Sequence, residues 1–163
     1  MAYYEFETDW RLRAPLLDVW NAIAAPDRWP QWWDGVVAAE LVRPGNGQGI
    51  GAVRRLTWRS RLPYTLTFDV EVARVEPMAL IEGRATGELE GTGTWRLASD
   101  GDVTSVHYSW HVRTTRPWMN LLAPLLRPVF RWNHDYVMAR GGEGLARLLG
   151  TQLVEAREPG LAP

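Results

Sequence analysis

The sequence predicts an α+β domain in which an antiparallel sheet of about seven strands packs against one long C-terminal helix. Three observations lead to this expectation. Residues 36–114 hold six successive strand-like segments with short connections, which imply antiparallel neighbours. A seventh strand-like segment opens the chain, and two short helical segments separate it from the other six. Residues 129–149 have the length and pattern of a helix.

The chain opens with a strand followed by two short helices. Residues 3–13 place large side chains at alternate positions, as a half-buried strand does. Pro15 ends this strand and suits a first helical turn, and residues 16–23 carry Leu, Val, Trp and Ile at helical intervals. Two prolines limit residues 26–35 to a second short helix, which carries three tryptophans.

Six strands and a helix complete the expected domain. The strands are residues 36–43, 51–60, 64–76, 78–86, 90–99 and 102–114. Three prolines make residues 116–130 a bent lead-in to the helix at 129–149. We expect residues 1–150 to form a single domain and residues 151–163 to form a disordered tail.

Composition excludes several classes of protein. The chain has 163 residues, enough for one well-packed domain, and its net charge of −1 provides no field to attract nucleic acid or an acidic membrane. It contains no cysteine, so disulfides and thiolate chemistry are excluded. No signal peptide or membrane span is evident, and we expect a cytoplasmic protein. Ten tryptophans indicate that large apolar surfaces must be covered.

Local motifs add a family resemblance. The opening "WRLRAPLLDVWNAIAAPDRWPQWWDGV" and the later "GELEGTGTWRL" and "TSVHYSWHV" resemble the polyketide cyclase/dehydrase branch of the START-like (SRPBCC) superfamily, over residues 3–149. The resemblance implies the helix-grip fold, in which a curved sheet wraps around the long helix. It also implies a cavity between sheet and helix that takes a hydrophobic small molecule. Binders, carriers and enzymes share this fold, so the resemblance leaves the activity open.

The C-terminal helix carries residues that fit such a cavity. Asn133, Val137 and Gly141 lie on one helical stripe, which we expect to face the sheet. A glycine within a helix costs about 1 kcal/mol relative to alanine, so Gly141 requires a reason. One interpretation is that Gly141 hollows the cavity floor and Asn133 contacts a ligand. The alternative is close helix–sheet packing, with Asn133 satisfied by a backbone group.

Aromatic residues on the strands are the other expected ligand-binding residues. They are Trp58, Phe68, Trp95, Tyr108 and Trp110. Together they form a surface large enough for a lipid or an aromatic polycycle, and the tyrosine and tryptophan tips can orient a ligand by hydrogen bonds. The alternative is that each simply fills the core.

No motif indicates a cofactor or a metal ion. His107 and His111 are four residues apart on one predicted strand, about 13 Å, which is too far to share a metal. The glycine-rich residues 44–51 lack the Lys-Ser/Thr and the helix that a phosphate-binding loop requires, and no Gly-x-Ser-x-Gly elbow is present. We therefore expect no cofactor and no metal.

Three residues are candidates for catalysis. Glu82 and Arg84 share one face of a predicted strand; if that face were inward, burial would force them to pair or to hold a polar part of the ligand. The opposite face is small and apolar enough to be the inner one, so both orientations remain open. In an enzyme, Arg84, Asn133 or Tyr108 would polarise a carbonyl, and His134 or Glu82 would act as acid or base.

The apolar residues 117–130 suggest a further contact. They exceed what one side of a bent segment needs to bury, and arginines flank them. They could form a lid, a homodimer contact or a peripheral membrane contact, or pack against the sheet edge. A membrane or partner contact predicts that Trp118, Leu121 and Leu122 are exposed to solvent.

Three functions fit these observations. The first, which we favour, is non-enzymatic binding or transport of a hydrophobic small molecule. The second is a cyclase- or dehydratase-like enzyme acting on an aromatic or polyketide-type compound, which requires at least two titratable side chains in the cavity. The third is a membrane-peripheral lipid-handling or partner-binding protein.

Overall fold

The computed structural model of the chain describes residues 2–154. Its elements are β1 (Tyr3–Leu12), α1 (Leu16–Ile23), the 3-10 turn η1 (Pro26–Arg28), α2 (Trp29–Trp32), β2 (Val36–Arg43), β3 (Val53–Arg59), β4 (Thr65–Glu76), β5 (Leu80–Gly87), β6 (Leu89–Asp100), β7 (Val103–Thr114), α3 (Pro117–Leu121) and α4 (Ala123–Leu148). The predicted α+β class, with two short helices after the first strand and a long final helix, is confirmed.

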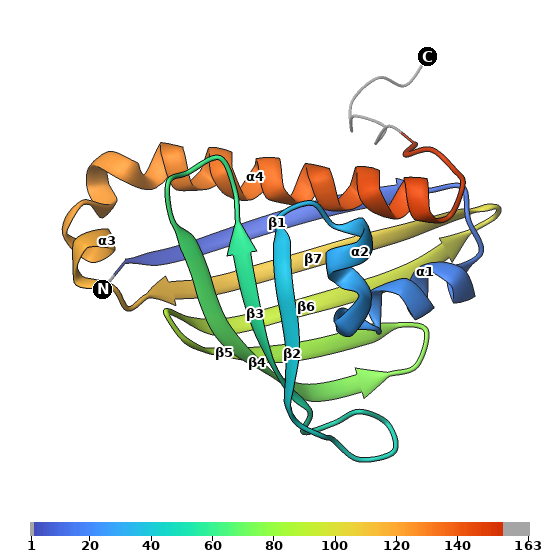
Figure 1. The fold of residues 1–163 in the computed structure, drawn as a ribbon. Helices are drawn as coiled ribbons and strands as arrows, with labels where there is room; N and C mark the ends of the chain where they lie inside the picture. Colours follow the sequence, from blue (N-terminus) through green and yellow to red (C-terminus); the bar gives the residue numbers. More distant parts are fainter. Residues whose placement is uncertain (1, 155–163) are drawn as a thin grey trace.

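All seven strands form one antiparallel sheet in the order β1-β7-β6-β5-β4-β3-β2. The first strand of the chain therefore pairs with the last, and their register runs from Tyr3 opposite Arg113 to Leu12 opposite Thr104. The β2–β3 and β4–β5 pairs contain register shifts, which bend strands and increase their twist. The sheet curves around α4, while α1 and α2 close one end of the resulting space and α3 lies at the other (Figure 1).

The long helix α4 begins six residues earlier than predicted, at Ala123 rather than at residue 129. Pro124 is tolerated because it stands in the first turn, where backbone N–H groups have no helical partner. Pro128 lies inside the helix and has no backbone N–H, so one helical hydrogen bond is missing. Pro128 and the preceding turn at Pro124 are exposed, so water can satisfy the carbonyl group of Pro124 that is left without a donor. No helix among residues 2–154 is long and apolar enough to cross a membrane.

The residues after α4 continue along the first strand. Leu153 forms an isolated antiparallel bridge with Leu12, so residues 151–154 are held against β1 although they were expected to begin a tail. Residues 155–163, the remainder of that expected tail, lie outside the described residues.

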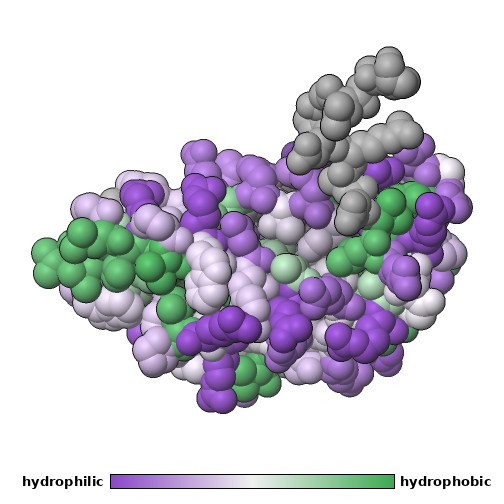
Figure 2. Space-filling model, turned by 90° about the horizontal axis from the view of Figure 1, so that it is seen from above, coloured by the Kyte–Doolittle hydropathy of each residue, from purple (hydrophilic) through white to green (hydrophobic). Residues whose placement is uncertain are grey.

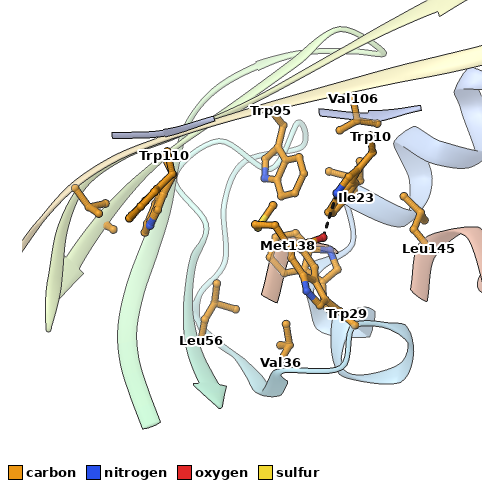
Figure 3. Packing of buried hydrophobic residues seen from close by; sticks show 14 of the residues in the cluster. Trp10, Ile23, Trp29, Val36, Leu56, Trp95, Val106, Trp110, Met138 and Leu145 are labelled. Carbon is orange, nitrogen blue, oxygen red and sulfur yellow. Dashed lines mark hydrogen bonds between the residues drawn. The ribbon is translucent and has the colours of Figure 1, made fainter. Parts of the chain in front are cut away.

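Tryptophans form the centre of the core at the end closed by α1 and α2 (Figure 3). The Trp10 indole N–H donates to the Met138 carbonyl at 3.1 Å, and the Trp33 indole N–H donates to the Val137 carbonyl at 2.9 Å. The two indole rings meet edge to face, with centroids 5.4 Å apart. Residues from β1 and from the end of α2 are thus bonded to consecutive carbonyls of α4, which holds the helix against the sheet.

Candidate functional site

A cavity of about 370 Å³ lies between the concave face of the sheet and α4. This volume is within the range of small-molecule binding sites. Alternate strand residues face it, because successive side chains of a strand point to opposite faces of a sheet. On β7, for example, Tyr108, Trp110 and Val112 line the cavity, whereas His107 and His111 lie on the outer face.

The five strand aromatics expected to bind a ligand all line this cavity: Trp58, Phe68, Trp95, Tyr108 and Trp110. Trp95 and Tyr108 stack with ring centroids 4.1 Å apart. Trp95 and Trp110 are also buried members of the hydrophobic core, so cavity wall and core are one surface here. Burial raises the pKa of Tyr108 further above neutrality, and its phenol therefore stays uncharged.

On the helix side, Asn133 and Val137 line the cavity as predicted from their shared stripe. The Asn133 Oδ1 atom is buried and finds no hydrogen-bond donor among residues 2–154. The alternative in which a backbone group satisfies this side chain is therefore not realised. A buried acceptor without a donor costs about 1–3 kcal/mol, which a ligand hydroxyl or amide would offset.

His134 lies beside Asn133 and also lines the cavity. Its ring stacks on Phe6, with centroids 4.1 Å apart and planes 12° apart. Burial lowers the pKa of His134 to about 4, so the imidazole is neutral at neutral pH. The Asp135 carboxylate is 3.6 Å from Nδ1, too long for a hydrogen bond, and within the described chain both ring nitrogens are unpartnered. His134 can therefore donate or accept one hydrogen bond toward a ligand.

Gly141 does not line the cavity, and the expectation that it hollows the cavity floor was wrong. A Cβ atom at this position would lie 2.7 Å from Cζ2 and Nε1 of the Trp33 indole. One turn further, a Cβ at Gly144 would overlap the backbone carbonyl of Trp32. These glycines make room for α2 and its tryptophans. Close helix–helix packing, not ligand space, explains them.

Glu82 and Arg84 also lie outside the cavity. Their neighbours Ile81 and Gly83 face it, so the two charged side chains occupy the opposite face of β5. Arg84 is exposed to solvent. The small apolar face of this strand is thus the inner one, and neither residue can reach a molecule held between sheet and helix.

Several lining residues were not among those expected from the sequence. Tyr4 and Phe6 contribute from β1, Trp29 from α2, Trp33 from the residue after α2, and Phe130 from α4. The alternation in β1 identifies its inward face but not which part of that face meets a cavity. The tryptophans of α2 were noted, but one helical turn is too short to show a face.

The cavity is nearly free of charge. Of the residues lining it, Arg54 alone carries a permanent charge, and its Nε donates to Asp27 at 2.8 Å. Several polar atoms of the cavity wall nevertheless lack a hydrogen-bond partner within the described residues. The Tyr4 hydroxyl and the indole N–H groups of Trp29 and Trp58 are buried without acceptors. The wall thus combines apolar rings with a few neutral donors and acceptors.

Solved structures share this architecture at low sequence identity. A protein from Thermus thermophilus has a TM-score of 0.72 at 17% identity, covering 89% of this chain and 99% of that one. The Zhui aromatase/cyclase from a Streptomyces species has a TM-score of 0.67 at 18% identity, covering 90% and 96%. A START superfamily protein from Mycobacterium smegmatis has a TM-score of 0.73 at 11% identity, covering 90% and 97%. These likenesses establish the helix-grip fold.

A family model described as polyketide cyclase / dehydrase and lipid transport matches residues 4–150. The chain belongs to this family. The resemblance drawn from its opening and late-strand motifs is therefore confirmed. A comparison with curated proteins finds no match. Related proteins of one fold carry different functions, so membership in the polyketide cyclase / dehydrase and lipid transport family does not by itself assign an activity.

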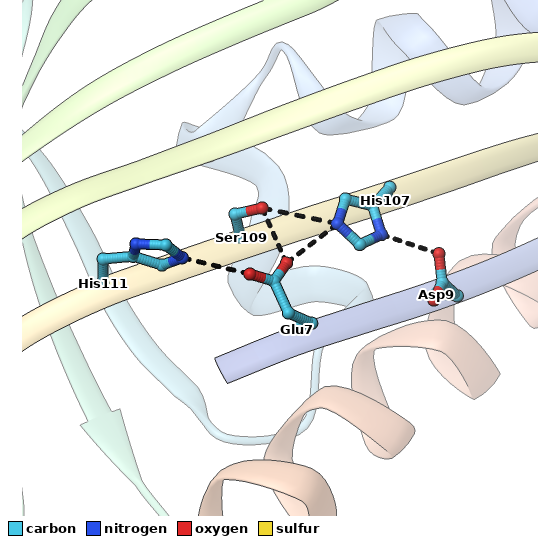
Figure 4. Close-up of polar contacts among 5 residues, drawn as sticks. All are labelled: Glu7, Asp9, His107, Ser109 and His111. Atoms are coloured by element: carbon cyan, nitrogen blue, oxygen red, sulfur yellow. Dashed lines mark hydrogen bonds and ion pairs between the residues drawn. The ribbon is translucent and has the colours of Figure 1, made fainter. Parts of the chain in front are cut away.

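This family member also carries a polar cluster on the outer face of its sheet (Figure 4). His107 donates from Nδ1 to Asp9 at 2.7 Å and from Nε2 to Glu7 at 2.8 Å. Glu7 also accepts from the Ser109 hydroxyl at 2.7 Å and from His111 Nε2 at 3.0 Å. Two strand neighbours, β1 and β7, supply all five side chains. His107 and His111, which are too far apart on β7 to share a metal ion, thus both contact the Glu7 carboxylate.

The outer cluster resembles a serine–histidine–aspartate arrangement but lacks its chemistry. Ionised carboxylates only accept hydrogen bonds, so His107 in its charged form donates from both nitrogens and cannot take a proton from Ser109. The hydrogen bond to Asp9 raises the pKa of His107, which favours this charged form. No group of three or more His, Asp and Glu side chains within residues 2–154 is arranged to hold a metal ion. The cluster is a set of exposed ion pairs joining two strands.

Proposed function

We propose that the protein binds and carries an uncharged, largely apolar small molecule in the cavity between sheet and α4. The observation that carries this proposal is the wall itself: about 370 Å³ of space surrounded by aromatic rings and a few neutral polar groups. Family membership supports a hydrophobic small-molecule ligand. The START superfamily name and the aromatase/cyclase name of two structural neighbours agree with such a ligand.

The charge of the wall favours a neutral ligand over a fatty acid or another carboxylate. Arg54 is already paired with Asp27, and His134 is uncharged at neutral pH because burial lowers its pKa to about 4. A buried carboxylate would meet no free cation and would bear the full cost of desolvation. A hydroxyl or carbonyl group fits better, since Asn133 and His134 present neutral hydrogen-bonding atoms side by side on α4.

A cyclase- or dehydratase-like enzyme is the second candidate, and one observation favours it. The cavity contains more than one titratable side chain, as an enzyme requires: His134 and Tyr108 both line it. Neutral His134 would accept a proton from an acidic carbon of the substrate, although a pKa of about 4 makes it a weak base. Glu82 and Arg84 have no part in this candidate mechanism, since they lie on the outer face.

Native mass spectrometry of the freshly purified protein, followed by organic extraction, is the first test. We expect a stoichiometric uncharged lipid or polycycle. Binding of the uncharged dye Nile red then tests the site with Val137→Trp, which fills the cavity, and with Ala139→Trp, which adds the same bulk to an exposed position of α4. Binding should be lost in V137W and kept in A139W.

The outcomes separate the two candidate functions. Equal dye binding by V137W and the wild type would refute the cavity as the site. A bound ligand recovered unchanged after incubation supports a carrier. Conversion of that ligand, abolished in His134→Phe while dye binding persists, would instead support the enzyme.

A further inference from the structure

An exposed apolar surface covers α3 and the start of α4, which we name the α3–α4 surface. Its members are Trp118, Leu121, Leu122, Leu125, Val129 and Trp132. Leu121 and Leu125 are 79% and 78% exposed, and a contiguous exposed apolar patch of this kind marks an interaction site. Figure 2 shows hydrophobic residues gathered at one end of the molecule, the end where α3 meets α4 in Figure 1. The exposure expected of a membrane or partner contact is therefore found.

The charge around this surface is one-sided, although the whole chain has a net charge of −1. Residues 103–134 contain four arginines and no aspartate or glutamate. Arg113 and Arg116 pair with Glu90 and Glu88, respectively. The positive charge that remains uncompensated therefore lies further along, at the start of α4.

Two arginines of α4 hold this charge beside the apolar residues. Arg127 donates to the Tyr3 carbonyl at 2.7 Å, and Arg131 lies over the Phe6 ring at 5.6 Å. Neither forms an ion pair with an acid of the described chain. Both are exposed, so their guanidinium groups remain available to anions from outside the molecule.

α3 connects this surface to the cavity. Met119 points inward, is 3% exposed and lines the cavity, while its neighbours Trp118 and Leu121 face solvent. Trp118 also packs edge to face on Tyr64, another cavity-lining residue, with centroids 5.5 Å apart. One helical turn therefore has the cavity on one side and the exposed apolar surface on the other.

We propose that the α3–α4 surface docks on an anionic lipid bilayer, with Leu121, Leu125 and the two tryptophans in the interface and the arginines at the headgroups. Leucine and tryptophan suit the headgroup–acyl boundary, and arginine suits anionic headgroups. A second copy of the chain fits less well, because a two-fold contact would bring the unpaired arginines near one another, while Glu88 and Glu90 are already paired. The docking stands apart from the cavity-ligand proposal; together they would place α3 between bilayer and cavity.

Vesicle co-sedimentation tests the docking with the full chain. We expect binding to phosphatidylcholine vesicles that contain phosphatidylglycerol, weaker binding to pure phosphatidylcholine, and loss of the difference at high salt. Leu121→Ser/Leu125→Ser should weaken binding at least tenfold, because each leucine loses its apolar contact with the bilayer. Arg131→Gln should weaken binding to the anionic vesicles about fivefold. The matched control is Leu41→Ser/Val42→Ser, two half-exposed apolar residues of β2, which should bind as the wild type does.

Each other outcome decides against the proposal. Absence of binding to the anionic vesicles overturns it, as does equal loss in the β2 control. A dimer in sedimentation velocity that L121S/L125S converts to monomer would assign the surface to a second copy. Nile red binding without vesicles tests the cavity separately: L121S/L125S should bind the dye normally, so failed docking with intact dye binding leaves the cavity proposal standing.

Discussion

Replacing Gly141 by alanine should destabilise the protein, although the same exchange in an exposed helix stabilises it. Alanine gains about 1 kcal/mol of helix propensity over glycine. Its Cβ would, however, lie 2.7 Å from Cζ2 and Nε1 of Trp33, an indole that is 1% exposed and cannot swing away. Overpacking of this kind costs about 1–3 kcal/mol. Displacing the ring also weakens its hydrogen bond to the Val137 carbonyl, worth about 1 kcal/mol.

The net expectation is a loss of about 1–3 kcal/mol in the free energy of unfolding. Urea unfolding, followed by tryptophan fluorescence and circular dichroism, measures this change, and the midpoint temperature should fall by about 2–4 °C per kcal/mol. Because Trp33 also lines the cavity, G141A should weaken Nile red binding as the indole moves. Stability and binding thus respond to the same displaced ring.

Two variants of α4 serve as comparisons for G141A. Ala139→Gly changes an exposed position and should cost about 1 kcal/mol by propensity alone. Gly144→Ala should be more damaging than G141A, because its neighbour is the backbone carbonyl of Trp32, which yields less easily than a side chain. If G141A proves as stable as the wild type while A139G loses about 1 kcal/mol in the free energy of unfolding, the close approach of Trp33 to α4 is refuted.

Three further predictions follow from buried and charged polar groups. Asn133→Leu should preserve stability or raise it by up to about 1 kcal/mol, because it removes a buried acceptor without a donor; a loss above about 2 kcal/mol in urea unfolding would show that Asn133 holds the fold. In the wild type, unfolded His134 takes up a proton below about pH 6.5, whereas the folded protein does so only near pH 4. The free energy of unfolding should therefore fall as the pH drops from 6.5 to 4, and His134→Phe should make it less dependent on pH over this range. An unchanged pH dependence would show that His134 is exposed to solvent. Hydrogen bonds from His111 and Ser109 lower the pKa of Glu7 to about 2, and the bond to Asp9 raises that of His107. The contribution of ionised Glu7 to the free energy of unfolding is lost as the pH falls from about 4.3 toward 2. The contribution of protonated His107 is lost as the pH rises above 6.5 through its raised pKa. The small difference in midpoint temperature between the wild type and Glu7→Gln should therefore be largest between about pH 4.3 and 6.5.

The order of elements and the inner face of the late strands were determined by the sequence itself. Period-two alternation placed Tyr108 and Trp110 on one face of β7 and His107 on the other, because a strand has only two faces and apolar burial selects one. The stripe of α4 likewise brought Asn133 and Val137 to the cavity wall. Such patterns are local, and their physical cause acts within one element.

Tertiary structure alone decided what each inward position meets. Gly141 and Val137 share one helical stripe, yet Val137 faces the cavity and Gly141 faces Trp33, because α2 packs against only part of α4. One face of β5 is small and apolar, but the sequence left both orientations open, and only the assembled sheet shows that Glu82 lies outside. The meeting of His107 with Glu7 likewise depends on the register of β1 with β7, strands about a hundred residues apart. Contacts between elements depend on how separate surfaces fit, and no periodicity within one segment encodes that fit.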